Sequence, residues 1–266
     1  MSAVIRGASY KTRVLVSAYY AYMLQYRAEL LLWALSGSLP FIAMGVWMKA
    51  AESGAFGLSP LEFARYFFSV FLVRQLTIVF VIFHVEEDIV HGRLSSRLLQ
   101  PLDPIFRHLA EHLAERGARL PLLFGLVCFF FILYPHAFWL PSVSRVIEFG
   151  LAIFSVFVLR FMIQYTLALA SFWMERATAL EELWFVIYLF LSGMIAPISL
   201  YPERIAFFIR LTPFPYLIDF PARVLVGAPV SFAQSFGMIF IWTLIFILLN
   251  RVLRVRGLKR YSGMGA

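Results

Sequence analysis

The sequence contains six apolar blocks separated by polar segments, and each block approaches the length that a helix needs to cross a lipid bilayer. The hydrocarbon core of a bilayer is ~30 Å thick, which requires about 20 consecutive apolar residues in a helix. Backbone groups cannot remain unpaired in lipid, so the blocks are predicted to be helices. The six predicted spans are Leu30–Met48, Phe63–Phe83, Leu120–Leu133, Val146–Phe172, Leu183–Ile198 and Phe232–Leu249.

Composition agrees with a membrane protein and excludes an ordinary soluble domain. Apolar residues make up 62% of the 266 residues and charged residues 14%, whereas about a quarter of the residues in a soluble domain are charged. The alternating segments of about 10 residues that form a transmembrane barrel are not seen. We therefore expect an all-α polytopic membrane protein with six transmembrane helices and a single membrane domain, 1–266. It divides into a lead (1–28), the spans (29–250) and a basic tail (251–266).

The basic residues are distributed unevenly between the two sides of the predicted bundle. The formal net charge of +8 would suggest a nucleic-acid partner if it were clustered on a soluble surface. Instead, 15 of the 23 basic residues lie on the side that holds both termini and the loop 86–119, and six lie on the other side. Cytoplasmic loops carry the excess of Lys and Arg. We therefore predict a multi-pass protein of the bacterial inner membrane with both termini in the cytoplasm, and no nucleic-acid partner.

Two segments outside the spans have the composition of amphipathic helices. Residues 9–27 mix five tyrosines with three basic residues, which favours a helix lying at the headgroup level; an ordered lead-in to the first span is the alternative. The polar loop 86–119 contains a short amphipathic piece, His91–Leu99, and then a helix, Ile105–Arg119, with an apolar stripe at helical spacing. We expect the charged side of the second helix to face solvent.

A proline-rich stretch follows the fifth predicted span. Six of the 13 prolines lie between Pro197 and Pro229, and they separate apolar pieces that are too short to span a bilayer. Such pieces are typical of re-entrant half-helices that dip into the membrane while packed against protein. We therefore expect re-entrant half-helices between spans five and six, on the outer side.

Two arginines lie inside predicted spans. Arg74 is near the middle of the second span, beside Gln75, and Arg160 in the fourth span is one helical turn before Gln164. An arginine at a helix centre costs about 2.5–3.5 kcal/mol on insertion scales, and no Asp or Glu lies in the middle of any span. We expect both arginines to face the protein interior or a water-filled cavity and to bind an acidic group of a substrate. The alternative is that they bond to carbonyls or a second subunit and fix the packing.

The motifs of several enzyme classes are absent. There is no G-x-x-x-x-G-K-[ST] nucleotide loop, no G-x-S-x-G and no H-E-x-x-H, and no catalytic residue is assigned. One H-x-x-E-H spacing occurs at His108, Glu111 and His112, where a helix would place two imidazoles one turn apart beside a carboxylate, as in some zinc peptidases. Because the pattern is short and no third protein ligand is evident, we expect no metal there.

Three stretches resemble the permease subunits of ABC transporters of the ABC-2 type. The first stretch follows the second span and resembles the family pattern of an acidic run, a Gly-x-Leu step and a Leu-Leu-x-Pro sequence. Its matching residues are Glu86, Glu87, Asp88, Gly92, Leu94, Leu98, Leu99 and Pro101. The end of the fifth span is similar to the Gly- and Pro-rich segment of the family in Gly193, Pro197, Pro202, Pro213 and Phe214. The pair Tyr26-Arg27 and the tail sequence Gly257–Tyr261 are reminiscent of one bacterial subgroup.

The resemblance implies a type V exporter-like fold in which this chain faces a second copy, or a homologous permease, above two separate ABC ATPase subunits. ATP and Mg²⁺ would be bound by the ATPase, and this chain would hold no cofactor. The matching loop residues would form a cytoplasmic coupling helix that docks on the ATPase, and the matching residues after the fifth span would form an outer gate. The substrate route would lie between the two permeases, with Arg74, Gln75, Arg160 and Gln164 along it. Transport would proceed by alternating access, with export the prevailing direction.

Three other classes remain as alternatives to an ATP-driven permease. An ATP-independent channel or secondary transporter would normally carry acidic or histidine relays in its spans, and these spans carry none. A membrane metallopeptidase would depend entirely on His108, Glu111 and His112. A purely structural membrane subunit would leave Arg74 and Arg160 unexplained.

Overall fold

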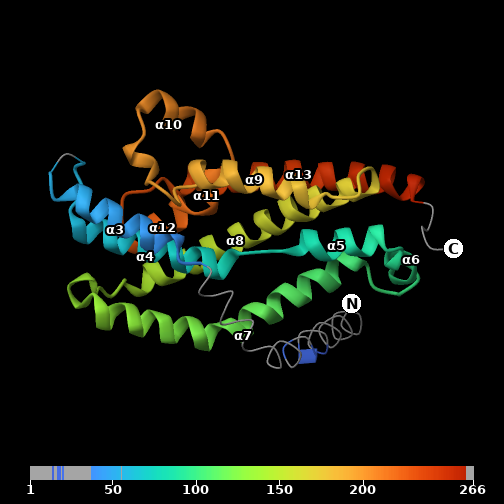
Figure 1. Cartoon of the computed structure of the whole chain (residues 1–266), viewed down its shortest axis with the longest axis horizontal. Coiled ribbons are helices and arrows are strands. Elements are labelled where there is room, and N and C mark those ends of the chain that lie inside the picture. Colours follow the sequence, from blue (N-terminus) through green and yellow to red (C-terminus); the bar gives the residue numbers. More distant parts are fainter. Residues whose placement is uncertain (1–13, 15–16, 19, 21–36, 55, 262–266) are drawn as a thin grey trace.

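The described part of the chain is a bundle of helices. The computed structural model describes residues 14, 17–18, 20, 37–54 and 56–261. Within these ranges the secondary structure is helical and no strand is present. The long helices run side by side along the length of the molecule (Figure 1). Four segments are long and apolar enough to cross a membrane: Pro60–Val90, Pro104–Leu133, Val143–Phe172 and Phe232–Arg260.

Two of the six predicted spans correspond to shorter helices. α3 (Leu39–Ala51) covers the second part of predicted span one, and the first part lies outside the described residues. α9 (Thr178–Leu191) covers the first half of predicted span five. The all-α membrane fold is therefore confirmed, while the count of six spans stays a prediction. The predicted interfacial helix, 9–27, lies outside the described residues except at four positions.

The second span is divided into two helices. α4 (Pro60–Thr77) begins with a capping box in which the side chain and backbone of Ser59 exchange hydrogen bonds with Glu62. It ends at Thr77, and α5 begins at Val81 and continues to Val90. The prediction of one uninterrupted helix over Phe63–Phe83 is therefore wrong, because three non-helical residues separate α4 from α5.

The predicted loop helix and the third span are one helix. α7 runs from Pro104 to Leu133, a length of 30 residues, and its first turn is capped by Asp103, whose side chain accepts a hydrogen bond from the backbone N–H of Ile105. The predicted boundary at Arg119 is absent. Pro121 lies inside α7 and has no N–H to donate to the preceding turn, yet the helix continues through it. Membrane helices tolerate a proline when neighbouring groups bond to the backbone carbonyl that it leaves free.

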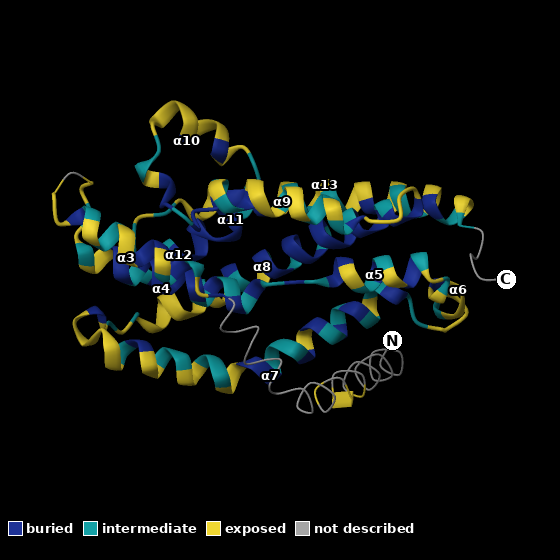
Figure 2. Ribbon diagram, viewed as in Figure 1, coloured by how far each residue is buried: buried dark blue, intermediate teal, exposed yellow. Residues whose placement is uncertain are grey.

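The core lies where α4 and α8 (Val143–Ala168) cross near the centre of the bundle (Figure 2). The short helix η2 (Leu169–Phe172) continues α8, and α13 (Phe232–Arg260) packs along it. α7 and α13 are mostly exposed along their apolar stretches, with side chains such as Phe124 and Phe240 about 70% exposed. Exposed apolar surface on this scale is what lipid or a second protein would cover.

Several short helices connect the long ones: four lie between α9 and α13, and one lies between α7 and α8. η3 (Ile198–Leu200), α10 (Glu203–Arg210), α11 (Phe214–Leu217) and α12 (Asp219–Val226) together fill the proline-rich stretch. Each is too short to span a bilayer, as predicted. α10 stands away from the bundle, whereas α12 packs against α4 and α8 (Figure 1). η1 (Pro135–Ala137) closes the turn between α7 and α8. At the other end of the bundle lies α6 (Arg93–Leu98), beside the ends of α5 and α13.

Candidate functional site

The predicted coupling residues form a hairpin tip at the end of the bundle. Gly92 connects α5 to α6 with a φ of 72°, a left-handed conformation that glycine adopts at least cost. Leu94 is buried in the core cluster below the tip. Leu98 is 39% exposed, Leu99 is 88% exposed, and Pro101 is exposed. The leucines of this segment therefore divide into one that anchors the tip and two that point outward.

The three consecutive carboxylates of α5, Glu86, Glu87 and Asp88, have three different partners. Glu86 accepts a hydrogen bond of 2.6 Å from the backbone N–H of Thr178, the first residue of α9. A carboxylate at that position satisfies a free donor and complements the helix dipole. Glu87 makes an exposed ion pair of 3.0 Å with Arg93. Asp88 is 3% exposed and forms an ion pair with Arg97 of α6.

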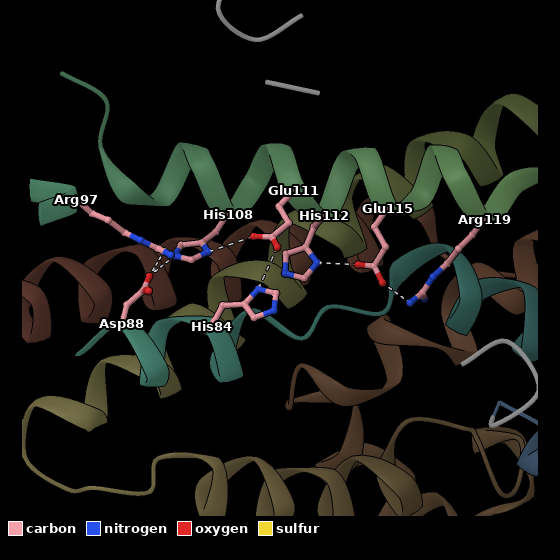
Figure 3. A network of polar contacts seen from close by, with 8 residues as sticks. All are labelled: His84, Asp88, Arg97, His108, Glu111, His112, Glu115 and Arg119. Carbon is pink, nitrogen blue, oxygen red and sulfur yellow. Dashed lines mark hydrogen bonds and ion pairs between the residues drawn. The ribbon is translucent and has the colours of Figure 1, made fainter. Parts of the chain in front are cut away.

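A buried row of polar side chains runs along the first half of α7 (Figure 3). His108 faces Asp88 and Glu111, while His112 faces Glu115, which also pairs with Arg119. Both histidines are only 2% exposed. The drawn residues come from the ends of α5 and α6 and from α7: His84, Asp88, Arg97, His108, Glu111, His112, Glu115 and Arg119.

This row corrects the expectation that the charged side of the loop helix faces solvent. The polar side chains of His108, His112 and Arg119 are buried. Of the predicted apolar stripe, Phe106 and Leu113 are 56% and 40% exposed, while Ile105 and Leu109 pack against the core. The physical reason is that α5 supplies Asp88 for His108 and His84 for Glu111, while Glu115 pairs with His112 and Arg119 within α7. A charge that is paired and hydrogen-bonded can be buried, and the sequence of α7 alone does not contain the partners from α5.

Arg116 joins α7 to the break between α4 and α5. Its Nε donates a 2.7 Å hydrogen bond to the carbonyl of Leu76, and its Nη2 donates a 3.0 Å bond to the carbonyl of Ile78. Its guanidinium also lies 3.6 Å from the ring centre of Phe157 in α8. These carbonyls lack helical partners because the helix is interrupted, so Arg116 satisfies groups that would otherwise be unpaired in an apolar region.

The arginines inside spans lie in the protein interior, as predicted. Arg160 is 8% exposed, donates a 3.3 Å hydrogen bond to Thr77 and lies 4.5 Å from the ring centre of Tyr188. Arg74 lies within electrostatic range of Arg160 and Tyr188. The two residues therefore meet at one interface between α4, α8 and α9.

The two glutamines named with these arginines lie in different places. Gln164 is buried and lies near Glu181, which precedes the predicted fifth span and also lies near Arg160. Burial raises the pKa of the Glu181 carboxyl to about 7. Gln75 is buried on the side of α4 that faces Arg116 of α7. The structure therefore brings Arg74, Arg160 and Gln164 together, and it separates Gln75 from them.

One predicted outer-gate residue, Gly193, lies beside a buried carboxyl group at the other end of α4. The hydroxyl of Tyr66 lies 2.8 Å from Asp219 and 2.9 Å from the carbonyl of Gly193. Asp219 also accepts a 3.3 Å hydrogen bond from the backbone N–H of Ile198. Burial raises the pKa of the Asp219 carboxyl above its ordinary value, and the nearby Arg223 opposes the rise.

The other outer-gate residues frame the short helices. Pro197 precedes η3, Pro202 precedes α10, and Pro213 precedes α11. Phe214 stacks on Trp184 of α9, with ring centres 4.5 Å apart. These prolines occupy helix starts, where a missing N–H costs least.

In a comparison with models of protein families, the sequence matches the ABC-2 family transporter proteins over residues 53–265. The chain belongs to this family. It is therefore a multi-pass membrane permease, the membrane subunit of an ABC transporter, and the resemblance carried by the loop and the proline-rich stretch is confirmed. No curated protein matches the chain. The matched range includes α4 to α13 and so all of the sites described above.

Several residues that lie at these sites of the ABC-2 family permease were not predicted from the sequence. Tyr66 and Asp219 are 153 residues apart in the chain, and nothing local links them. Arg116 carries no local signal for its role, since its carbonyl partners lie in α4 and the break. His84 had a usable signal, because it lies four residues before Asp88 and therefore on the same face of a helix.

Proposed function

We propose that this permease is driven by a separate ABC ATPase that docks on the tip formed by α6 and the residues after it. The observation that supports the proposal is the exposure of Leu98, Leu99 and Pro101 at this tip. Apolar side chains presented together at a polar end of a membrane protein are typical of a protein–protein contact. The ATPase would hold ATP and Mg²⁺, since this sequence contains no phosphate-binding loop.

The tip is connected to four other helices, which suits it to transmit a movement. Asp88 of α5 pairs with Arg97 of α6. Asp103, which caps α7, makes a 2.7 Å ion pair with Arg254 of α13. Glu86 caps α9. A force applied to α6 would therefore reach α5, α7, α9 and α13 through polar contacts, as coupling between a distant ATPase and the spans requires.

The distribution of charge and the family membership support an orientation in the membrane and a direction of transport. The tip side carries most of the basic residues, which supports a cytoplasmic position for the tip and both termini in the bacterial inner membrane. Export by alternating access between two facing permeases, either copies of this chain or homologues, is the activity proposed. The exposed apolar faces of α7 and α13 leave surface for lipid and for the second permease.

The leucines at the tip offer a direct test of the docking proposal. Leu99→Ser removes an 88% exposed leucine whose burial against a partner would contribute about 1.5–3 kcal/mol. We expect the permease to bind its ATPase at least about tenfold more weakly, measured by copurification and by ATPase activity in proteoliposomes. The matched control is Leu140→Ser, which changes a leucine 82% exposed at the opposite end of the bundle. Equal binding by Leu99→Ser and wild type would reject the docking site.

Arg74 and Arg160 are the residues from which we infer a substrate route. We propose that Arg74 lies along the route, while Arg160 and Gln164 hold the interface that borders it; Gln75 faces Arg116 of α7 instead and is left out of the route. Arg160 has partners within the chain in Thr77 and Tyr188, which supports a packing role for it.

The variants Arg74→Gln and Arg160→Gln separate the two roles. For Arg74→Gln we expect assembly with the ATPase to be retained and transport in proteoliposomes to be lost. For Arg160→Gln we expect a lower melting temperature before any selective loss of transport. Full transport by Arg74→Gln would remove this residue from the proposed route.

A further inference from the structure

Three side chains from two helices converge where the end of α5 meets α7. His84 of α5 and Glu111 of α7 approach with Nδ1 and Oε1 3.4 Å apart, and His108 of α7 places its Nδ1 3.7 Å from the other oxygen of Glu111. One ligand atom from each of the three residues lies within 4.8 Å of the others. Figure 3 shows His84 of α5 and His108 of α7 both turned toward the carboxylate of Glu111.

The histidine nitrogens that face Glu111 make no hydrogen bond with any of the described residues. The Nδ1 atoms of His84 and His108 are both buried and without a hydrogen-bond partner. His108 is 2% exposed, so water does not readily supply the missing contact. Glu111 is their ion-pair partner at 3.4 Å and 3.7 Å, but neither nitrogen makes a hydrogen bond to it, and a buried polar atom without a hydrogen bond costs about 1–3 kcal/mol. An ion held between the two nitrogens and this carboxylate would satisfy all three groups.

The surrounding residues also suit a metal ligand. The second ring nitrogen of His108, Nε2, lies 3.4 Å from a carboxylate oxygen of Asp88. Histidines that bind a metal through one nitrogen usually have the other nitrogen held by a carboxylate or carbonyl. The nearby Arg97, whose Nη1 is also 3.4 Å from this nitrogen, is neutralised by its ion pair with Asp88.

We propose that His84, His108 and Glu111 form a binding site for a divalent transition-metal ion, with Zn²⁺ as the best chemical match. Two imidazoles and one carboxylate are a common ligand set for this ion. With metal–ligand bonds of about 2.0–2.2 Å, neighbouring tetrahedral ligands lie about 3.3–3.5 Å apart, so side chains whose ligand atoms lie within 4.8 Å of one another would close in slightly around the ion. Three protein ligands leave the fourth position to water.

This site differs from the zinc peptidase arrangement suggested by the H-x-x-E-H spacing. That arrangement needs both His108 and His112 as ligands and Glu111 as a free base. Here His112 faces Glu115 at 3.2 Å, on the far side of Glu111, and Glu111 is itself a ligand. The ion would join the end of the second span to the first half of α7, immediately beside the hairpin tip. The inference does not depend on which protein docks at that tip.

Metal binding by the full-length permease in lipid nanodiscs tests the proposal. The protein is stripped with a chelator, dialysed against Zn²⁺ or Co²⁺, and its metal content is measured by mass spectrometry. We expect one ion per chain for wild type and at least tenfold weaker binding for His84→Ala and for Glu111→Gln, which preserves the shape of the side chain. Bound Co²⁺ should show the intense visible absorption of a four- or five-coordinate site with nitrogen ligands.

Two control variants separate this site from the alternatives. His91→Ala removes an exposed histidine on the adjacent turn and should bind the ion as wild type does. His112→Gln should also retain the ion, whereas loss of the ion in this variant, with folding intact by size exclusion, would favour the H-x-x-E-H ligand set and overturn the proposal. Substoichiometric binding by wild type, or equal binding by wild type and Glu111→Gln, would also overturn it and leave the three residues as an ion-pair cluster. The metal content and the Co²⁺ absorption of the wild-type permease test the site even if a variant fails to fold.

Discussion

Among single residues, Gly193 shows most clearly how a buried polar site constrains the chain. It has a φ of 92°, in the region that side chains rarely adopt. A Cβ atom added there would lie 2.6 Å from the hydroxyl of Tyr66 and 2.8 Å from Cβ of Asp219. Glycine is therefore required by both the backbone and the space, and its carbonyl serves as a partner for Tyr66.

Gly193→Ala should destabilise the permease by about 2 kcal/mol or more, because backbone strain and overpacking each cost about 1–3 kcal/mol. The measurement is the thermal unfolding temperature of the detergent-solubilised protein. Gly237→Ala is the matched control, since a Cβ at Gly237 meets nothing within 4 Å and alanine favours a helix. Equal melting temperatures for the two variants would contradict this account of the site around Asp219.

Among the helices, the interruption of the second span is the feature that most affects its neighbours. α4 and α5 together would make one helix by hydropathy, but the chain leaves helical geometry between Thr77 and Val81. Arg116 of α7 stabilises the interruption by bonding to two carbonyls beside it. The break and α7 therefore depend on each other, and α5 is free to present His84 and Asp88 to α7.

Arg116→Met should lower the stability of the permease by about 2–4 kcal/mol, because two carbonyls lose a charged donor and the methionine preserves only the packing. Arg116→Lys should recover part of the loss, since an ammonium group can bond to one carbonyl but lacks the fork of arginine. Melting temperatures compared with those of Arg251→Met, which changes an exposed arginine on α13, provide the measurement. A loss no greater than that of Arg251→Met would show that the break needs no donor from α7.

Across the molecule as a whole, one end of the bundle is held together by polar contacts and the other by apolar packing and a buried carboxyl group. At the polar end, Asp103 and Arg254 connect the start of α7 to the last helix over 151 positions of the chain. Ser95 of α6 and Tyr261, just after α13, lie in hydrogen-bonding range at 3.3 Å. The hairpin tip is therefore connected to the last helix of the chain as well as to the second span.

Exchanging the charges of Asp103 and Arg254 tests this long-range connection. Each single change, Asp103→Arg or Arg254→Asp, should lower stability by about 1 kcal/mol, because the pair is partly exposed and like charges then face each other. The double exchange should restore part of the loss. Melting temperatures of the four proteins give the coupling energy between the two positions. Additive losses in the double variant would indicate that the ion pair contributes nothing.

Hydropathy and charge along the chain were sufficient to predict an all-α membrane protein, the approximate positions of its long helices and the short pieces around Pro202 and Pro213. These properties are local: whether a segment enters lipid depends mainly on its own side chains. The family resemblance rested on the same local stretches, and the family match confirms it.

Local patterns could not predict which polar faces are buried, where the second span breaks, or that α7 is continuous. Each of these depends on a partner that lies far away in the chain: Asp88 for His108, Leu76 for Arg116, and Asp219 for Tyr66. A buried charge or an unpaired carbonyl is tolerated only if another helix supplies its counterpart. Because that counterpart is chosen by the packing of helices in space, periodicity within one segment cannot reveal it.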